Sequence, residues 1–277
     1  MGLIFDKNIA EFYDSWYHST QGKAIAGSIE QLIVAVLNPR PEERVLDIGC
    51  GTGNHLLMLS KMGMDVSGVD ASPYMIDRAR ERLGHGCSLK MGVAEDLPYD
   101  DNEFDLAVFI NTLEFLDNPL AALREAGRVA NKKVFIGVLN SFSWNGLLKR
   151  AQGCLGDPLF GHARLFNLWQ MRSLLEMAYG QVPISWGSIR IRSIYDEEKT
   201  PFTFIKQFLN RKHSLFGHSP FAYFLGFSAE MAYHIKTDNL PLKIRLKNAG
   251  QSLVGAKTIE DLNCSKRVDK DERGLPV

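Results

Sequence analysis

The stretch Val45–His55, VLDIGCGTGNH, decides the fold of this sequence. It opens with a short apolar run typical of a buried strand, and three glycines follow at alternate positions, Gly49, Gly51 and Gly53. Glycine allows the positive φ of a tight turn and lets a ligand approach the backbone closely. The stretch therefore predicts a strand, a ligand-binding turn and the start of a helix.

Short apolar runs and longer helical periods alternate from this stretch to residue 140. This alternation predicts βαβ units and a mostly parallel sheet. We expect five strands at Val45–Gly49, Asp65–Asp70, Ser88–Ala94, Phe104–Ile110 and Lys133–Leu139. Helices are expected at His55–Gly63, Ser72–Gly84 and Asn118–Ala130. The second of these has clear boundaries, because Ser72 can cap it, Pro73 suits its first turn and Gly84 follows its last turn.

The remainder of the chain predicts a helix at Asn167–Tyr179, a strand in Val182–Ile191 and a last strand at Ala229–Ile235, which form an antiparallel edge. We divide the chain into an N-terminal helical lid (1–40), a Rossmann-like core (41–192), a Phe-rich helical cap insertion (193–226), a last strand with a C-terminal extension (227–262) and a flexible tail (263–277). The predicted fold class is thus α/β, a Rossmann-like doubly wound sheet with an antiparallel edge strand and this insertion.

Composition restricts the classes of partner. Lys plus Arg and Asp plus Glu both number 32, so we expect no nucleic acid as partner. The N-terminus lacks an apolar signal region and no apolar run approaches ~20 residues, which predicts a cytoplasmic chain without a transmembrane segment and leaves peripheral membrane contact open. The four cysteines lie far apart, so we expect no metal site.

The spacing of the glycines separates two kinds of cofactor. A dinucleotide fingerprint has the pattern GxGxxG, whereas the third glycine position counted from Gly49 is Asn54. Asp47, two residues before Gly49, would repel a diphosphate but attract an ammonium group. Asp70 ends the next strand, where a carboxylate can bind ribose hydroxyls. The charges favour a cationic cofactor, and a nicotinamide-dependent dehydrogenase is the weaker alternative.

Four stretches resemble the successive motifs of class I S-adenosylmethionine-dependent methyltransferases, and more narrowly the small-molecule branch with quinone-biosynthesis enzymes. They are VLDIGCGTGNH, GVDASPYMIDRAR, AEDLPYDDNEFDLAV and NPLAALREAGRV. The resemblance implies S-adenosyl-L-methionine as cofactor. It assigns the methionine part to Asp47 and the turn of Gly49, Cys50, Gly51 and Gly53, the ribose to Asp70, the adenine to Ala71, Met75, Ala94 and Glu95, and the sulfonium side to Asn111.

One position departs from the family pattern. The family often carries an Asp before the Ala-Glu pair, and this sequence has Val93 there. Adenine recognition then falls to the Ala94 backbone and to Glu95 or Asp96. On the helix after the fourth strand, Glu125 and Arg128 are expected to form a structural ion pair.

The predicted function is methyl transfer to a small metabolite that the sequence does not identify; an apolar acceptor fits the sequence but is not required by it. The cofactor supplies the activation, so no catalytic residue is required, and Tyr13, Tyr17, His18 and Glu114 are candidates for a general base. The seven phenylalanines between Phe202 and Phe227 fit a substrate cap, a purely structural core or a membrane contact. A non-catalytic cofactor-binding or partner-binding module is a second alternative.

Overall fold

A computed structural model describes residues 4–84, 86–143, 163–189 and 216–231 of the 277-residue chain. These residues belong to one compact unit, residues 1–235. An eight-stranded sheet in the order β3-β2-β1-β4-β5-β8-β6-β7 forms its centre. The strands are β1 (Arg44–Ile48), β2 (Asp65–Asp70), β3 (Ser88–Met91), β4 (Phe104–Ile110), β5 (Ala130–Leu139), β6 (Ile184–Ile189), β7 (Phe216–Gly217) and β8 (Phe224–Glu230).

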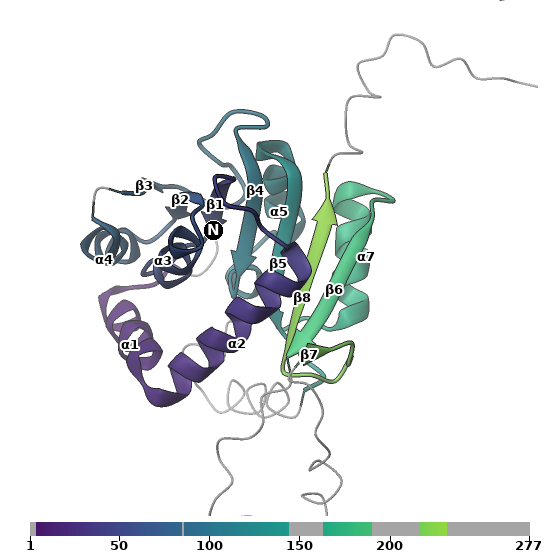
Figure 1. Cartoon of the computed structure of the whole chain (residues 1–277), viewed down its shortest axis with the longest axis horizontal. Coiled ribbons are helices and arrows are strands. Elements are labelled where there is room, and N and C mark those ends of the chain that lie inside the picture. The colour runs from purple at the N-terminus through teal and green to yellow at the C-terminus, as the bar shows by residue number, and fades with distance from the viewer. Residues whose placement is uncertain (1–3, 85, 144–162, 190–215, 232–277) are drawn as a thin grey trace, which may run out of the picture. The chain divides into compact units, whose positions relative to one another are not determined.

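Helices cover both faces of the sheet (Figure 1). They are α1 (Lys7–His18), α2 (Thr20–Leu37), α3 (Asn54–Lys61), α4 (Pro73–Leu83), α5 (Pro119–Val129) and α7 (Leu168–Tyr179), with a 3₁₀ turn, η1, at Leu113–Phe115. Strands β1 to β5 pair in parallel, and β8 runs antiparallel between β5 and β6. The predicted α/β class, with a mostly parallel sheet and an antiparallel edge, is confirmed.

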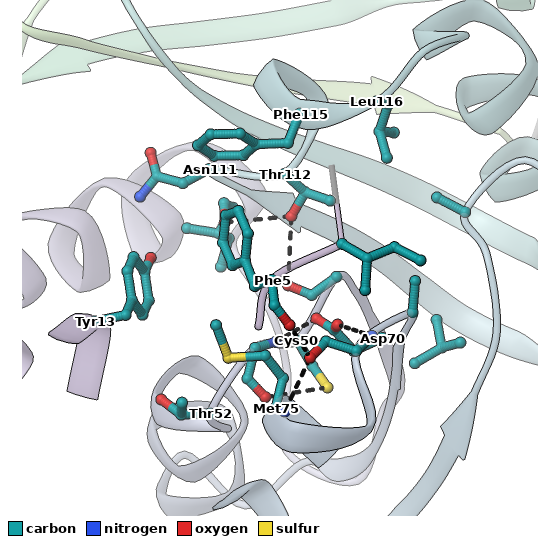
Figure 2. Close-up of a pocket in the computed structure, with 18 of the residues that line it drawn as sticks. Phe5, Tyr13, Cys50, Thr52, Asp70, Met75, Asn111, Thr112, Phe115 and Leu116 are labelled. Carbon is teal, nitrogen blue, oxygen red and sulfur yellow. Dashed lines mark hydrogen bonds between the residues drawn. The ribbon is translucent and has the colours of Figure 1, made fainter. Parts of the chain in front are cut away.

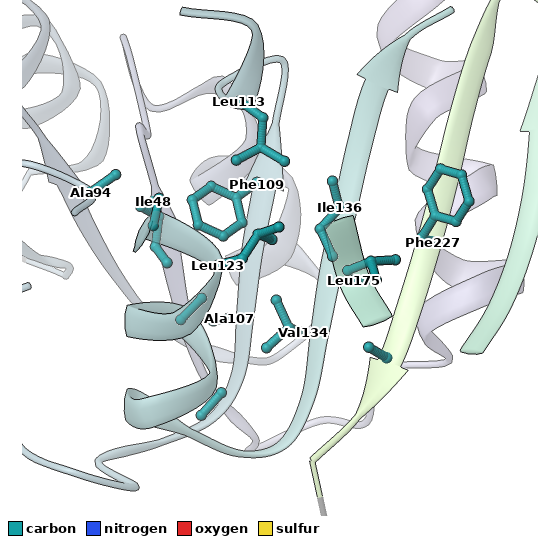
Figure 3. Close-up of a cluster of buried hydrophobic side chains, with 14 of the residues drawn as sticks. Ile48, Ala94, Ala107, Phe109, Leu113, Leu123, Val134, Ile136, Leu175 and Phe227 are labelled. Carbon is teal, nitrogen blue, oxygen red and sulfur yellow. The ribbon is translucent and has the colours of Figure 1, made fainter. Parts of the chain in front are cut away.

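Successive residues of the central strands face opposite sides, which builds two separate cores. On β4, Ala107 and Phe109 pack with α5 and α7, as Figure 3 shows, whereas Leu106 and Val108 pack toward α2, α3 and α4. Both sets are fully buried. Burial on both faces explains why these strands read as continuous apolar runs.

The predicted helix boundaries hold where a cap was visible in the sequence. The Ser72 hydroxyl accepts a hydrogen bond from the Met75 N–H at 3.3 Å, Pro73 begins α4 and Gly84 ends it. Before α7, the Asn167 side chain and Gln170 form a reciprocal capping box. Two strands differ in length from the prediction. Strand β3 is shorter and ends at Met91 instead of Ala94, and β5 is longer and begins at Ala130 instead of Lys133.

The predicted last strand at Ala229–Ile235 begins five residues too late, because β8 runs from Phe224 to Glu230, and residues 232–235 lie outside the described residues. Gly226, the predicted end of the insertion, lies inside β8. A Cβ atom at Gly226 would come within 2.7 Å of Leu32 on α2, so glycine here permits a close approach of helix and sheet. The same contact recurs at Gly187 on β6.

The predicted helical insertion, Ser193–Gly226, is corrected at its C-terminal end. Phe216 and Gly217 form β7, which pairs with β6, and residues 224–226 belong to β8. The part of this insertion at 193–215 lies outside the described residues, as do the C-terminal extension beyond residue 231 and the tail. Among the helices that the structure describes, none has the length and apolar character needed to span a membrane.

Candidate functional site

A cavity lies at the carboxyl ends of β1, β2 and β4, where ligands bind in open α/β sheets (Figure 2). Its lining comes from six segments: Ile4 and Phe5, Tyr13 and Tyr17 of α1, the glycine turn with its helix start (49–52, 54 and 55), the end of β2 with Met75, the segment 92–95, and residues 110–112, 115 and 116 after β4. Among these described residues the charged side chains are acidic, Asp70 and Glu95, and none is Lys or Arg.

The three glycines of the turn all have positive φ, but each meets a different neighbour. A Cβ atom at Gly49 would lie 2.2 Å from the Thr112 side chain, and one at Gly53 would lie 3.1 Å from Ala79 and Leu83. At Gly51 the space is open toward the cavity, with the Met75 sulfur 4.0 Å away. Gly49 and Gly53 therefore serve packing, whereas Gly51 leaves room for a ligand.

Asp70 stands at the end of β2 with its carboxylate already oriented. One oxygen accepts the Gly51 N–H at 2.9 Å and the other accepts the Ser72 N–H at 2.8 Å. Burial raises the pKa of Asp70, and these backbone hydrogen bonds oppose the rise. Each oxygen keeps a lone pair for a further donor, which suits hydroxyl groups of a ligand.

Asp47, on β1, carries two buried carboxylate oxygens, neither of which has a hydrogen-bond partner. Burial, and then the charge of Asp70, raise the pKa of Asp47 to about 8. Its charge acts on Tyr13 and Tyr17, which both line the cavity. A buried, unpaired carboxylate is unfavourable on its own and favours a cationic partner.

Asn111, directly after β4, is, like Asp47, a buried polar residue with an unpartnered side-chain oxygen. Its φ of 56° lies in the left-handed region, and its side-chain oxygen is buried without a hydrogen-bond partner. Its N–H donates to the Gly137 carbonyl of β5 at 2.9 Å, which holds this turn against the sheet. Strained backbone that is held by its surroundings is typical of ligand sites.

The N-terminal segment and α1 close one side of the cavity with aromatic rings. Phe5 packs edge to face on Phe115 with 5.0 Å between ring centroids, and the Phe5 carbonyl accepts the Ser72 hydroxyl at 2.6 Å. The Tyr17 hydroxyl and the His55 Nε2 share a hydrogen bond of 2.9 Å. Burial lowers the pKa of His55 to about 4, so this imidazole is neutral at physiological pH.

Helix α1 is tied to α4 by two ion pairs. Arg78 lies 3.7 Å from Glu11, and Arg82 pairs with Asp14. Arg82 also donates to the Thr52 carbonyl in the glycine turn. The same arginine thus connects α1 to the turn that lines the cavity.

Most of the predicted cofactor residues come together here. Gly49, Cys50, Gly51, Asp70, Ala71, Met75, Ala94, Glu95 and Asn111 all line the cavity. Gly53 instead packs on α4, and Asp47 lies outside the lining although its charge reaches it.

The general-base candidates separate into two groups. Tyr13 and Tyr17 line the cavity, and burial raises the pKa of Tyr13 to about 12. His18 is exposed, with its Nδ1 2.8 Å from the Asp14 carbonyl oxygen. Glu114 is buried outside the lining and accepts the Leu139 N–H at 2.7 Å, which indicates a structural role.

Sequence reasoning missed several residues of the cavity. His55 stands inside the glycine motif, but its partner Tyr17 is 38 positions away and no spacing connects them. Phe5 and Phe115 are single aromatic residues in segments with no motif of their own. Val93, noted as a departure, lines the cavity beside Ala94.

Residues 46–136 match the model of a family described as "Methyltransferase domain". An uncharacterised protein of Methanocaldococcus jannaschii is 35% identical over 145 residues, which are 52% of this chain and 64% of that protein. An uncharacterised methyltransferase of Mycobacterium bovis is 34% identical over 128 residues, which are 44% of this chain and 52% of that protein. The chain thus spans between about half and two thirds of the length of these relatives.

Among solved structures, a Thermotoga maritima protein titled SAM-dependent methyltransferase, possible histamine N-methyltransferase, aligns with a TM-score of 0.62 and 21% identity. The alignment covers 81% of this chain and 97% of that chain. The chain thus has a Rossmann-like α/β fold similar to that of this structure, with a cavity at the carboxyl edge of its sheet. Within this fold, residues 46–136 are the part that is similar to the methyltransferase-domain family.

Proposed function

We propose that this chain is an S-adenosylmethionine-dependent methyltransferase that acts on a small, apolar metabolite. The observation that carries the proposal is the buried carboxyl group of Asp47, which has no hydrogen-bond partner and acts electrostatically on Tyr13 and Tyr17 in the cavity lining. The charged side chains of that lining are acidic. A cofactor with an ammonium and a sulfonium group would neutralise this negative charge. A dinucleotide would instead bring a diphosphate beside Asp47 and Asp70.

The order of the strands supports one orientation of the cofactor across the sheet. Asp47 on β1 and Asn111 after β4 would hold the methionine part, and Asp70 at the end of the neighbouring β2 would hold the ribose. The adenine would then lie beyond β2, where Ala94 and Glu95 line the cavity after β3. Gly51 would allow the backbone to contact the ligand closely.

When bound, the cofactor supplies an electrophilic methyl group, and the residues of this chain align the reactants and exclude water. The rings of Phe5 and Phe115, with Leu116, offer apolar contacts to an acceptor. Tyr13 and His55 are neutral at physiological pH, because burial raises the pKa of the first to about 12 and lowers that of the second to about 4. They suit a role in positioning better than one as a strong base.

Isothermal calorimetry tests the cofactor assignment. We expect S-adenosylmethionine and S-adenosylhomocysteine to bind stoichiometrically and NADH not to bind. NADH binding without a response to S-adenosylhomocysteine would refute the proposal and favour a dehydrogenase.

Transfer of a labelled methyl group to a panel of small acceptors distinguishes an enzyme from a cofactor-binding module. The panel should include apolar phenols and hydroquinones, amines, thiols and carbon acids. Transfer to any one of them supports the enzyme. Stoichiometric binding with no transfer across the whole panel would favour the module. A cytoplasmic location and a small-molecule partner remain part of this proposal.

A further inference from the structure

The segment that connects β3 to β4 serves two parts of the molecule. Its first residues, Gly92 to Glu95, line the cavity. Its following residues, Leu97 to Asp101, are held by the side chains of Glu125 and Arg128 on α5. Leu97 lies only two positions after Glu95, a span of at most ~7 Å. A shift at Leu97 therefore moves the cavity wall.

Arg128 makes an unusually complete set of contacts for a surface residue. Its Nη2 donates to the Leu97 carbonyl at 3.1 Å, and its Nη1 donates to the Tyr99 carbonyl at 2.8 Å and to Asp101 at 2.9 Å. Two further bonds, of 2.9 Å from Nε and 2.7 Å from Nη2, join the guanidinium to Glu125. The planar fork of arginine suits this geometry, which lysine cannot reproduce.

Glu125, on the same helix, binds the segment together with Arg128, and we call this pair of side chains the clamp. Its Oε2 accepts the Leu97 N–H at 3.0 Å, so both backbone groups of Leu97 are bound by the pair. Hydrogen bonding to Arg128 lowers the pKa of Glu125 and keeps the carboxylate ionised. The side chains of Leu97 and Tyr99 are buried in the core, which fixes the held carbonyls from the other side.

The cavity end of the segment makes few side-chain hydrogen bonds: Glu95 accepts the Asn118 N–H at 3.4 Å, and the backbone N–H of Gly92 donates to the Asp70 carbonyl at 3.1 Å. Val93 and Ala94 have no side-chain hydrogen-bonding group, so they can contact a ligand only through their backbone and methyl groups. An isolated bridge pairs Val93 with Asp96, in a turn where Asp96 N–H donates to the Val93 carbonyl at 3.3 Å. Backbone recognition of a flat base requires that this turn keeps one position.

We propose that Arg128, held by its hydrogen bonds to Glu125, is a positioning residue: it fixes the backbone position of Val93–Glu95 so that this backbone can recognise the base of the cofactor. This inference rests on the proposed function. It goes beyond the expected structural ion pair, since it assigns to the pair an effect on which base is bound. Asp47 and Asp70 lie on other strands, and the Asp70 carboxylate is bound by Gly51 and Ser72 rather than by Glu125 or Arg128.

The test compares two ligands that differ only at the base, S-adenosylhomocysteine and S-inosylhomocysteine, in which an oxo group replaces the amino group. Calorimetry gives the ratio of their affinities for the wild-type chain and for Arg128→Met, which retains an unbranched apolar stem. We expect the preference for adenine to fall about tenfold in Arg128→Met, the equivalent of one well-formed hydrogen bond. Arg128→Lys should restore only part of the preference.

Arg44→Met is the matched control. Arg44 is a half-exposed arginine at the opposite end of β1, where it lies 3.7 Å from Asp105. We expect this variant to keep the wild-type ratio. The proposal would be overturned if folded Arg128→Met kept the wild-type ratio of affinities, which includes the case in which it lost affinity for both ligands equally. A wild-type chain that binds both ligands equally would also overturn it.

A second variant covers the case in which Arg128→Met does not fold. Glu125→Gln retains the length of the side chain but removes the negative charge that holds Arg128 in place. Its adenine preference should fall by less than that of Arg128→Met, and an unchanged ratio in folded Glu125→Gln would overturn the proposal. Absence of binding of either ligand to the wild-type chain would instead refute the proposed function, so the two failures are distinguishable.

Discussion

Ligand binding should depend on pH through Asp47, because the cofactor requires this buried carboxylate in its charged form. Burial and the charge of Asp70 raise the pKa of Asp47 to about 8 in the free chain. The ionised fraction then rises from ~1% at pH 6 to ~9% at pH 7. The affinity for S-adenosylhomocysteine should therefore increase about ninefold over this interval, or ~1.3 kcal/mol. The ammonium group of the ligand stays protonated in this range, since amino groups titrate near pH ~8.

Calorimetry at pH 6 and pH 7 measures this slope directly. Binding should also release protons near pH 7, which appears as a difference in binding enthalpy between buffers of different ionisation enthalpy. Asp47→Asn should lose both the slope and the proton release. Asp105→Asn is the control, because Asp105 lies at the opposite end of the sheet, where Arg44 and Lys132 contact it. A flat wild-type slope, or the same slope in Asp47→Asn, would refute the reasoning.

The stability of the free chain should change in the opposite direction. The pKa of Asp47 in the folded chain is above its ordinary value, so the folded state binds more protons than the unfolded state between these values. The free energy of unfolding should therefore fall as the pH rises from ~4 to ~8. Asp47→Asn removes the buried charge and should raise the free energy of unfolding at pH 8 by ~1–3 kcal/mol, measured by urea denaturation. A variant less stable than the wild type at pH 8 would contradict this account.

Three further substitutions test separate parts of the site. Asp70→Ala should weaken S-adenosylhomocysteine binding by ~1.5–3 kcal/mol, because charge-assisted hydrogen bonds to the ribose are lost, and unchanged affinity in calorimetry would leave Asp70 a structural role only. Gly49→Ala should destabilise the fold by more than ~2 kcal/mol in thermal unfolding, since its φ is positive and its Cβ would overlap Thr112, and a wild-type melting temperature would contradict this. Tyr17→Phe should lower stability by ~1 kcal/mol in urea denaturation through the lost bond to His55, and no change would show that the bond contributes nothing.

The fold was predictable where local signals agreed. On α4 the cap at Ser72, the proline of the first turn and the glycine after the last turn all indicated the observed helix. The central strands were predictable because burial on both faces makes them continuous apolar runs. The start of β8 is not predictable from the sequence, because a glycine such as Gly226 usually indicates the end of a strand or loop. The close contact with α2 explains why a glycine occurs inside this strand.

The candidate site was predictable where it lies in motifs and not where it depends on contacts between distant segments. Asp70 and Gly51 follow from strand and turn, and the structure joins them by a hydrogen bond. Phe5 reaches the cavity only because the N-terminal segment crosses it and bonds to Ser72. The support of the segment after β3 by Arg128 likewise joins residues about thirty positions apart. Such contacts follow from packing rather than from spacing.

Asp47 and Asn111 combine buried oxygens without hydrogen-bond partners on neighbouring strands, and this gives the site its strongest physical argument. Two buried carboxylate oxygens on Asp47 lack partners, and a buried amide oxygen on Asn111 lacks one as well, with its backbone in the left-handed region. Elsewhere, helix caps, apolar strands and close glycine contacts agree with the fold. Natural sequences tolerate local conflicts mainly where a ligand resolves them. A ligand that offers a cation to Asp47 and a donor to Asn111 would resolve these conflicts together, whereas an anionic ligand would increase the first of them.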